Sequence, residues 1–201
     1  MADFTSQLIT AFITLFVIID PFTSTPVFFS MTRKKTAAEK LEAAKTAVFV
    51  ASAALFAFML AGPLLFKLIG IELQHFKIAG GIVLFIIGLE YVLKITLPRE
   101  KAETKVDLGV VVIGVPLITG PGALTASVVL VSTVGLPITA MAAALVMITT
   151  FIILLLAPKI MALLGETGSE VFSRIMGLLL ASIAVNMILT GLAAAAIVPA
   201  G

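Results

Sequence analysis

Six apolar runs, each long enough to cross a bilayer, fill most of this chain of 201 residues. They lie at about 8–31, 43–65, 76–93, 108–134, 138–156 and 171–198. A spanning α-helix needs about 20 apolar residues. Only 12% of the residues are charged, about half the fraction found in soluble domains. The sequence therefore predicts an all-α membrane protein with six transmembrane helices and no separate soluble domain.

Two of these runs, the first and the fourth, contain a pair of prolines separated by small or hydroxyl residues. The first pair is Pro21 and Pro26, and the second is Pro116 and Pro121. Proline lacks an amide hydrogen and clashes with the preceding turn of a helix. Freed backbone groups at membrane depth are tolerated only where protein or a polar cavity satisfies them. We therefore expect breaks at 20–26 and 115–122, and we expect both breaks to build one site.

The two halves of the chain resemble each other. An offset of 95 places Pro21 on Pro116, and an offset of 96 places Gly81 on Gly177. This predicts a first three-span repeat at 1–95, a cytoplasmic linker at 96–107 and a second, inverted repeat at 108–201. Inverted repeats with interrupted helices in matching positions are typical of secondary transporters. The alternative is chance, because Pro and Gly are frequent in membrane helices.

The basic residues indicate an orientation. Eleven of the 13 Lys and Arg residues fall in or beside the links that follow the first, third and fifth runs. Lys67 and Lys77 alone fall on the other side. By the positive-inside rule, the basic links are cytoplasmic and both termini lie outside.

Each predicted break would expose amides at the start of one half-helix and carbonyls at the end of the other. The amide end suits a carboxylate, and the carbonyl end suits a cation or an ammonium group. Hydroxyl side chains add polar contacts, and glycines allow close approach to the backbone. The candidate substrate-binding residues are Asp20, Pro21, Thr23, Ser24, Thr25, Pro26, Pro116, Thr119, Gly120, Pro121, Gly122, Thr125 and Asn186.

Asp20 is the one acidic residue within the first apolar run. A charged Asp at the centre of a span costs about 2.5–3.5 kcal/mol on insertion scales. It is the candidate coupling residue for a proton or a cation, or a partner for a substrate ammonium group. Alternatively, its carboxylate caps the amides that the break releases. Asn186 either bonds across helices or lines the pathway.

The residue inventory argues against several classes of protein. The chain has no Cys and a single His, which offers no thiolate or histidine cluster for a metal. It contains no phosphate-binding glycine loop, metalloprotease helix or nucleophile elbow. We therefore expect no enzyme, no metal, no cofactor and no nucleic-acid partner.

Three segments resemble the MarC family of integral membrane proteins. Asp20–Thr32 is similar to the first signature of that family, Pro116–Ala123 to the second, and Arg174–Leu180, leading to Asn186, to its last span. The resemblance covers essentially the whole chain. It implies a six-span protein of the inner membrane, some of whose relatives are described as transporters or exporters of small neutral amino acids such as glycine and alanine. The family usually has Gly, often followed by Asn, where Thr23 and Ser24 stand.

The sequence thus favours a secondary transporter or exporter of a small neutral amino acid. This protein would be embedded in the lipid bilayer, and Asp20 is its candidate proton-coupling residue. A channel for small solutes or ions is the alternative, although the chain lacks the rings of charge that select ions. The sequence does not indicate an oligomeric state.

Overall fold

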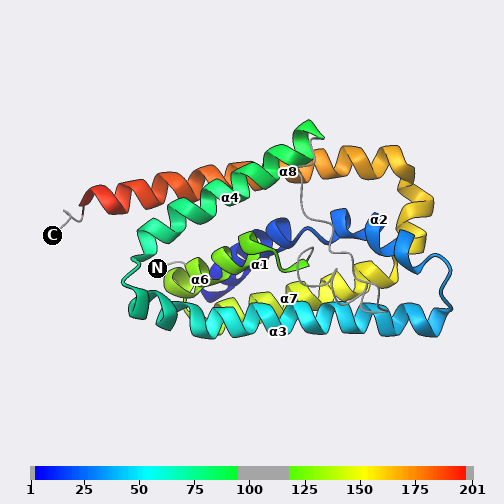
Figure 1. The fold of residues 1–201 in the computed structure, drawn as a ribbon, viewed down its shortest axis with the longest axis horizontal. Helices are drawn as coiled ribbons and strands as arrows, with labels where there is room; N and C mark the ends of the chain where they lie inside the picture. The colour runs from blue at the N-terminus through cyan, green and yellow to red at the C-terminus, as the bar shows by residue number, and fades with distance from the viewer. Residues whose placement is uncertain (1–2, 95–117, 198–201) are drawn as a thin grey trace.

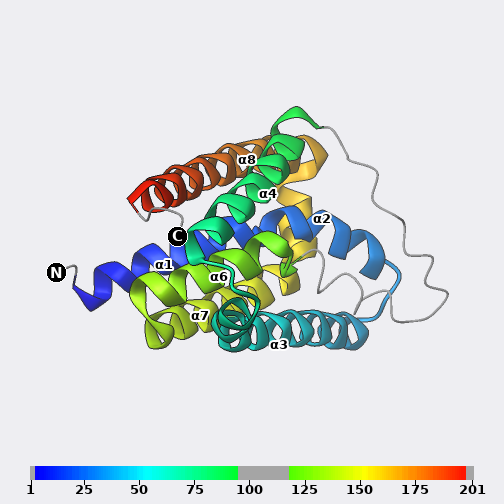
Figure 2. The ribbon, with the colours of Figure 1, turned by 60° about the vertical axis from the view of Figure 1, so that its left-hand side comes forward.

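In the computed structural model, residues 3–94 and 118–197 are described, and in these ranges every regular element is an α-helix. Helices α4 (Leu73–Leu93) and α8 (Ala157–Ile197) form one side of the molecule. Helices α3 (Ala37–Ile69) and α7 (Leu136–Leu155) form the opposite side. Between these pairs lie α1 (Phe4–Ile19), α2 (Pro21–Thr32) and α6 (Pro121–Val134), as Figures 1 and 2 show.

The described helices account for most of the predicted spans. Four segments are long and apolar enough to cross a membrane: α3, α4, α7 and Thr167–Ala196 of α8. The pair α1 and α2, bent by 40°, makes a fifth candidate. Helix α6 has only 14 residues, and the linker at 96–107 and the beginning of the fourth span at 108–117 lie outside the described residues. The all-α membrane fold is therefore confirmed, whereas the sixth span and the repeat stay predictions.

The first span is broken, but more narrowly than we expected. Helix α1 ends at Ile19, Asp20 adopts a left-handed conformation with φ 42°, and α2 begins at Pro21. A residue before proline is disfavoured in the α-helical region, and Asp is one of the few residues that tolerate the left-handed one. The prediction that the break extends to Pro26 is wrong, because Pro26 lies inside α2.

Helix α3 is longer than predicted at both ends. It begins with a capping box, in which Thr36 and Glu39 each accept a hydrogen bond from the other's backbone amide. In the second apolar run, at about 43–65, Gly62 and Pro63 predict the far end of the span, but the helix continues to Ile69 and ends at left-handed Gly70. Proline removes one hydrogen bond from a membrane helix, and neighbouring helices can compensate for that loss.

Between the fifth and sixth apolar runs, the sequence favours a loop at 158–170. This prediction is wrong, because these residues are helical on both sides of Gly165. Gly165 has φ 62° and ψ −172°, a combination that is essentially restricted to glycine. The segment before Gly165 runs along one end of the molecule, from α7 toward α2 (Figure 1). The remainder of α8 turns back along α4.

Helices α4 and α8 pack antiparallel through glycine. A Cβ atom built on Gly88 would lie 2.8 Å from the carbonyl oxygen of Gly177, and one on Gly81 would lie 2.9 Å from that of Ala184. Neither backbone can move aside without shifting a helix. Small residues at such positions allow membrane helices to approach closely, so this pair forms a tight seam.

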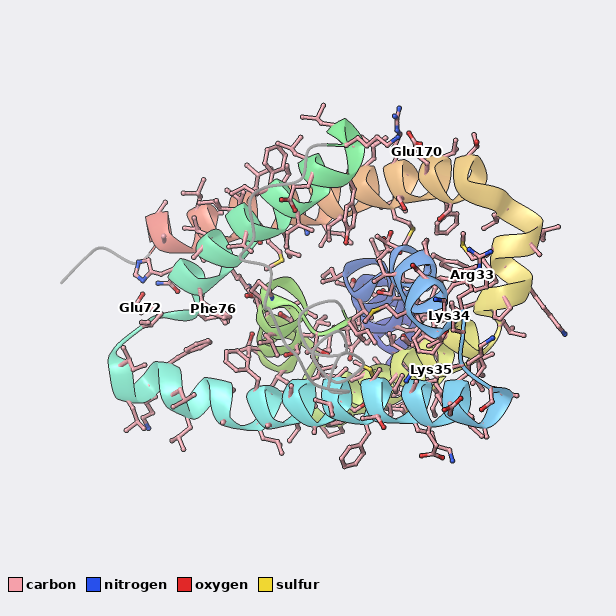
Figure 3. The ribbon with its side chains drawn as sticks, turned by 45° about the vertical axis from the view of Figure 1, so that its right-hand side comes forward. Arg33, Lys34, Lys35, Glu72, Phe76 and Glu170 are labelled. Atoms are coloured by element: carbon pink, nitrogen blue, oxygen red, sulfur yellow. The ribbon has the colours of Figure 1, made fainter. Side chains whose placement is uncertain are left out.

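Charged residues gather at the ends of the molecule. Arg33, Lys34 and Lys35 lie at one end, where α2 connects to α3, whereas Glu72 and Phe76 lie at the other (Figure 3). The first residue of α1 and the last residue of α8 both lie toward the Glu72 end (Figures 1 and 2). The Arg33 end is the one that the charge pattern predicts to be cytoplasmic, and this orientation stays a prediction.

Candidate functional site

The buried carboxyl group of Asp20 is the centre of the site. Its residue is 2% exposed, and the side chain lies at the junction between α1 and α2. Among the ion pairs of the described residues, none includes Asp20. A buried acidic group inside a membrane span that lacks a cationic partner is typical of a functional position.

Thr23 makes two hydrogen bonds to this carboxyl group. Its backbone amide donates to Oδ1 at 3.2 Å, and its hydroxyl donates to Oδ2 at 2.5 Å. Asp20 is thus the N-cap of α2, which confirms the capping interpretation. A role in coupling is a separate property that this geometry permits.

The Thr23 hydroxyl also reaches α8. It lies 3.2 Å from the hydroxyl of Ser173, and either oxygen can donate. Phe22 and Phe172 pack beside this contact, with their ring centroids 4.5 Å apart and their planes tilted by 53°. Our sequence reasoning missed Ser173. The spacing of Ser169, Ser173 and Gly177, four residues apart on one helix face, is the signal of close packing that could have found it.

A cavity of about 410 Å³ opens between α2 and α8 near the Arg33 end. Its lining combines apolar, hydroxyl and charged side chains: Pro26, Phe29, Ser30, Arg33, Lys94, Met161, Ser169, Glu170 and Ser173. This volume falls in the range of small-molecule sites. Because Ser173 lines the cavity and also contacts Thr23, the cavity leads to the Asp20 junction.

The rim of the cavity contains an ion network that joins α4 to α8. Glu170 accepts from Lys94 at 2.7 Å and from Arg174 at 2.8 Å. Arg33 has no ion pair among the described residues and also lines the cavity. Among the described residues of the rim, Arg33 is therefore a cation without an ion-pair partner, which suits a carboxylate.

The second predicted break is described from Ile118 onward, and Pro116 lies outside the described residues. Gly120 is the N-cap of α6, and Pro121 occupies its first turn, where the missing amide hydrogen costs nothing. Pro121 thus lies at the start of its helix, as Pro21 does, whereas Pro26 lies inside a helix. Thr119 is 2% exposed and donates to the carbonyl oxygen of Ala51 on α3 at 2.9 Å.

The space beside Gly122 is filled by the protein. A Cβ atom at this position would collide with the side chain of Leu84 and lie 3.6 Å from Ile18. The start of α6 therefore lies against the end of α1, two residues before Asp20. The structure brings the two interrupted segments side by side, with apolar contacts between them.

The remaining candidates separate into two groups. Ser24, Thr25 and Thr125 are buried, and their hydroxyls donate to backbone carbonyls of their own helices. Such bonds are common for hydroxyl residues in spans. Asn186 is exposed on α8, and no hydrogen bond from its side chain to another helix is found in the described part of the chain. The structure does not bring Asn186 to the Asp20 junction.

These features define a polytopic membrane protein with an interrupted span, a buried carboxyl group at the interruption, and a cavity of mixed lining that Ser173 and Thr23 connect to that carboxyl group. Within the described ranges, no cluster of three or more His, Cys, Asp or Glu side chains could hold a metal ion.

Comparison with known proteins places the chain in a family. Residues 5–196 match the MarC family of integral membrane proteins, and the chain belongs to that family. It is 36% identical over 194 residues to a UPF0056 membrane protein of Methanocaldococcus jannaschii, a match that covers 92% of this chain and 95% of that protein. It is 34% identical to the UPF0056 membrane protein YhcE of Escherichia coli, over 90% of this chain and 89% of that one. No solved structure matches.

Proposed function

We propose that this MarC-family protein is a secondary transporter of small neutral amino acids, such as glycine or alanine, in the cytoplasmic membrane. The observation that carries the proposal is the interruption at Asp20, where a buried carboxyl group without a cationic partner adjoins a cavity at the basic end. Interrupted helices that surround a polar site are the common architecture of secondary transporters.

The helix contacts support an inverted repeat. Helix α2 packs against α7 and α8, and α6 packs against α3 and α4. In the predicted repeat, α2 corresponds to α6, α3 to α7, and α4 to α8. When each helix is replaced by its counterpart, the contacts of α2 become those of α6. The contacts between α4 and α8 show the same correspondence. Gly81 lies against Ala184, and Gly88 lies against Gly177. An offset of 96 places Gly81 on Gly177 and Gly88 on Ala184, so it converts the first pair into the second.

The cavity fits a small zwitterion better than a large or strongly charged solute. Arg33 provides a cation for a substrate carboxylate, whereas Glu170 and the hydroxyls of Ser30 and Ser173 provide acceptors for an ammonium group. In this conformation the cavity lies at the predicted cytoplasmic end. On the other side of the junction, the side chains of Leu84 and Ile18 pack against Gly122.

Transport would require that this apolar contact opens while the cavity closes. The rigid seam between α4 and α8 and the packing of α3 on α7 provide two frames that can move against the central helices. Movement of repeats around a fixed site is the general mechanism of alternating access.

Counterflow tests the proposal. In liposomes that contain the purified protein and a high internal concentration of unlabelled glycine or alanine, we expect rapid uptake of the labelled amino acid from outside. Protein-free liposomes provide the control. If neither the wild type nor Asp20→Asn shows counterflow, the transport proposal is wrong. Conductance that does not saturate would instead support the channel alternative.

A further inference from the structure

We propose that the hydroxyls of Ser173 and Thr23 form a proton relay between the cavity at the basic end and the carboxyl group of Asp20. This inference deepens the proposed transport function, on which its biological purpose rests, by assigning a route for the coupling proton. Ser173 was not among the residues that the sequence indicated.

The first argument is the isolation of Asp20 from solvent. The residue is 2% exposed, so a proton cannot reach its carboxyl group directly from bulk water. A group that gains and loses a proton during a transport cycle needs a hydrogen-bonded path. Hydroxyls can serve in such a path because each is both a donor and an acceptor.

The second argument is the continuity of the hydroxyl contacts. Asp20 Oδ2 lies 2.5 Å from the Thr23 hydroxyl, which lies 3.2 Å from the Ser173 hydroxyl. Ser173 also lines the cavity of about 410 Å³. Two side chains from different helices, 150 positions apart in sequence, therefore connect the buried carboxylate to this cavity.

The proton balance of the relay is simple. A hydronium ion in the cavity gives a proton to Ser173 Oγ, which passes its own proton to Thr23 Oγ1, which passes its own to Asp20 Oδ2. Each hydroxyl ends neutral, the carboxylate becomes a carboxylic acid, and the cavity retains water. Release of the proton follows the same steps in reverse after both hydroxyls rotate.

The surroundings of Asp20 contain few other titratable groups. Helices α1, α2, α6 and α7, which meet at the junction, contain no Asp, Glu, Lys, Arg or His. Helix α8 contributes Lys159, Glu166, Glu170 and Arg174, of which Glu170 lines the cavity. Arg33 and Lys94 also line it. Of these charged groups, Arg33, Lys94 and Glu170 line the cavity, so Asp20 is the proton acceptor at the inner end of the relay.

The test measures protonation of Asp20 directly and requires no transported substrate. The chain has three aspartates, Asp3, Asp20 and Asp107, so aspartate labelled with ¹³C at the carboxyl carbon gives few infrared bands. The band of Asp20 is the one that Asp20→Asn removes. In liposomes, its conversion from carboxylate to carboxylic acid is followed after a rapid jump from alkaline to acidic pH.

We expect Ser173→Ala and Thr23→Val to slow this conversion about tenfold or more, as loss of a positioned proton-transfer group does. Ser173→Thr and Thr23→Ser retain a hydroxyl and should protonate Asp20 at nearly the wild-type rate. Ser182→Ala is the matched control, because Ser182 is an exposed serine of the same helix that bonds only to Leu178.

The relay is wrong if Ser173→Ala and Thr23→Val protonate Asp20 at the wild-type rate, if Ser182→Ala slows it equally, or if wild-type Asp20 never protonates. The intensity of the helical amide band shows whether each variant is folded. The comparison of Ser173→Ala with Ser173→Thr keeps the test valid if alanine loosens the packing. If Ser173→Ala slows the protonation of Asp20 but the wild-type protein transports no amino acid, the result would support the relay and contradict the proposed substrate.

Discussion

At the residue scale, Asp20 has a backbone role and a proposed chemical one. Its left-handed conformation ends α1, and its carboxyl group caps α2. Asn has nearly the same shape, accepts the same hydrogen bond from the Thr23 amide, and also tolerates a left-handed conformation. Asp20→Asn is therefore the substitution that separates the structure of the break from its proton chemistry.

One residue-scale prediction concerns the tight seam that glycines form between α4 and α8. Gly88→Ala would place a methyl group 2.8 Å from the carbonyl oxygen of Gly177, and overpacking of this kind costs about 1–3 kcal/mol. We expect a lower melting temperature in detergent than for the wild type. Gly168→Ala is the matched control, because the three atoms nearest to its Cβ atom would all belong to the Leu164 side chain, the first at 3.2 Å. Equal melting temperatures for the two variants would show that the seam is not tight.

At the element scale, each break in the helices has a local cause, yet not every breaking residue produces a break. Pro21 lies at the start of α2 and Pro121 at the start of α6, where proline is well tolerated. Pro26 and Pro63 lie inside helices. The sequence predicts the break at Asp20 because a residue before proline avoids the helical region. It does not predict that Pro26 and Pro63 leave their helices intact, because that depends on neighbouring helices.

Contacts between elements that are far apart in the chain could not be predicted from the sequence either. The approach of Ser173 to Thr23 depends on how α2 packs on α8, and no local pattern fixes that packing. The same holds for Leu84, which fills the space beside Gly122. The hydroxyl residues of the first break were identified from sequence, but the tertiary structure determines which hydroxyl contacts α8 and which bonds to the backbone nearby.

One element-scale prediction tests the capping box of α3. Thr36→Ala removes the side chain that accepts from the Glu39 amide, a change that typically costs about 1 kcal/mol. We expect faster hydrogen exchange of the amides at positions 37–40, with no change in the rest of α3. Thr149→Ala serves as the control, since its hydroxyl bonds within α7 to Leu145. Unchanged exchange at 37–40 would contradict the capping role.

At the scale of the whole molecule, the chain has two chemically distinct ends. Arg33, Lys34 and Lys35 lie at the end near the cavity, and Glu72 lies at the other (Figure 3). The resemblance to the MarC family, the all-helical fold and the broken first span could all be predicted from the sequence. The first half of the fourth span and the linker lie outside the described residues, so those predictions stay open.

The orientation can be tested on the natural background because the chain has no cysteine. We expect a membrane-impermeant maleimide to label Lys34→Cys in inside-out vesicles and Gln74→Cys in right-side-out vesicles. The reverse pattern would invert the assignment of the basic end to the cytoplasm. Labelling after detergent solubilisation controls for reactivity at both positions.

The central claim, that Asp20 couples proton movement to amino-acid transport, is tested most directly by proton-driven accumulation. Proteoliposomes with an imposed pH gradient should concentrate labelled alanine when they contain the wild-type protein. Asp20→Asn should exchange alanine by counterflow but should not concentrate it, because its side chain cannot carry a proton. Accumulation by Asp20→Asn that equals that of the wild type would contradict the account.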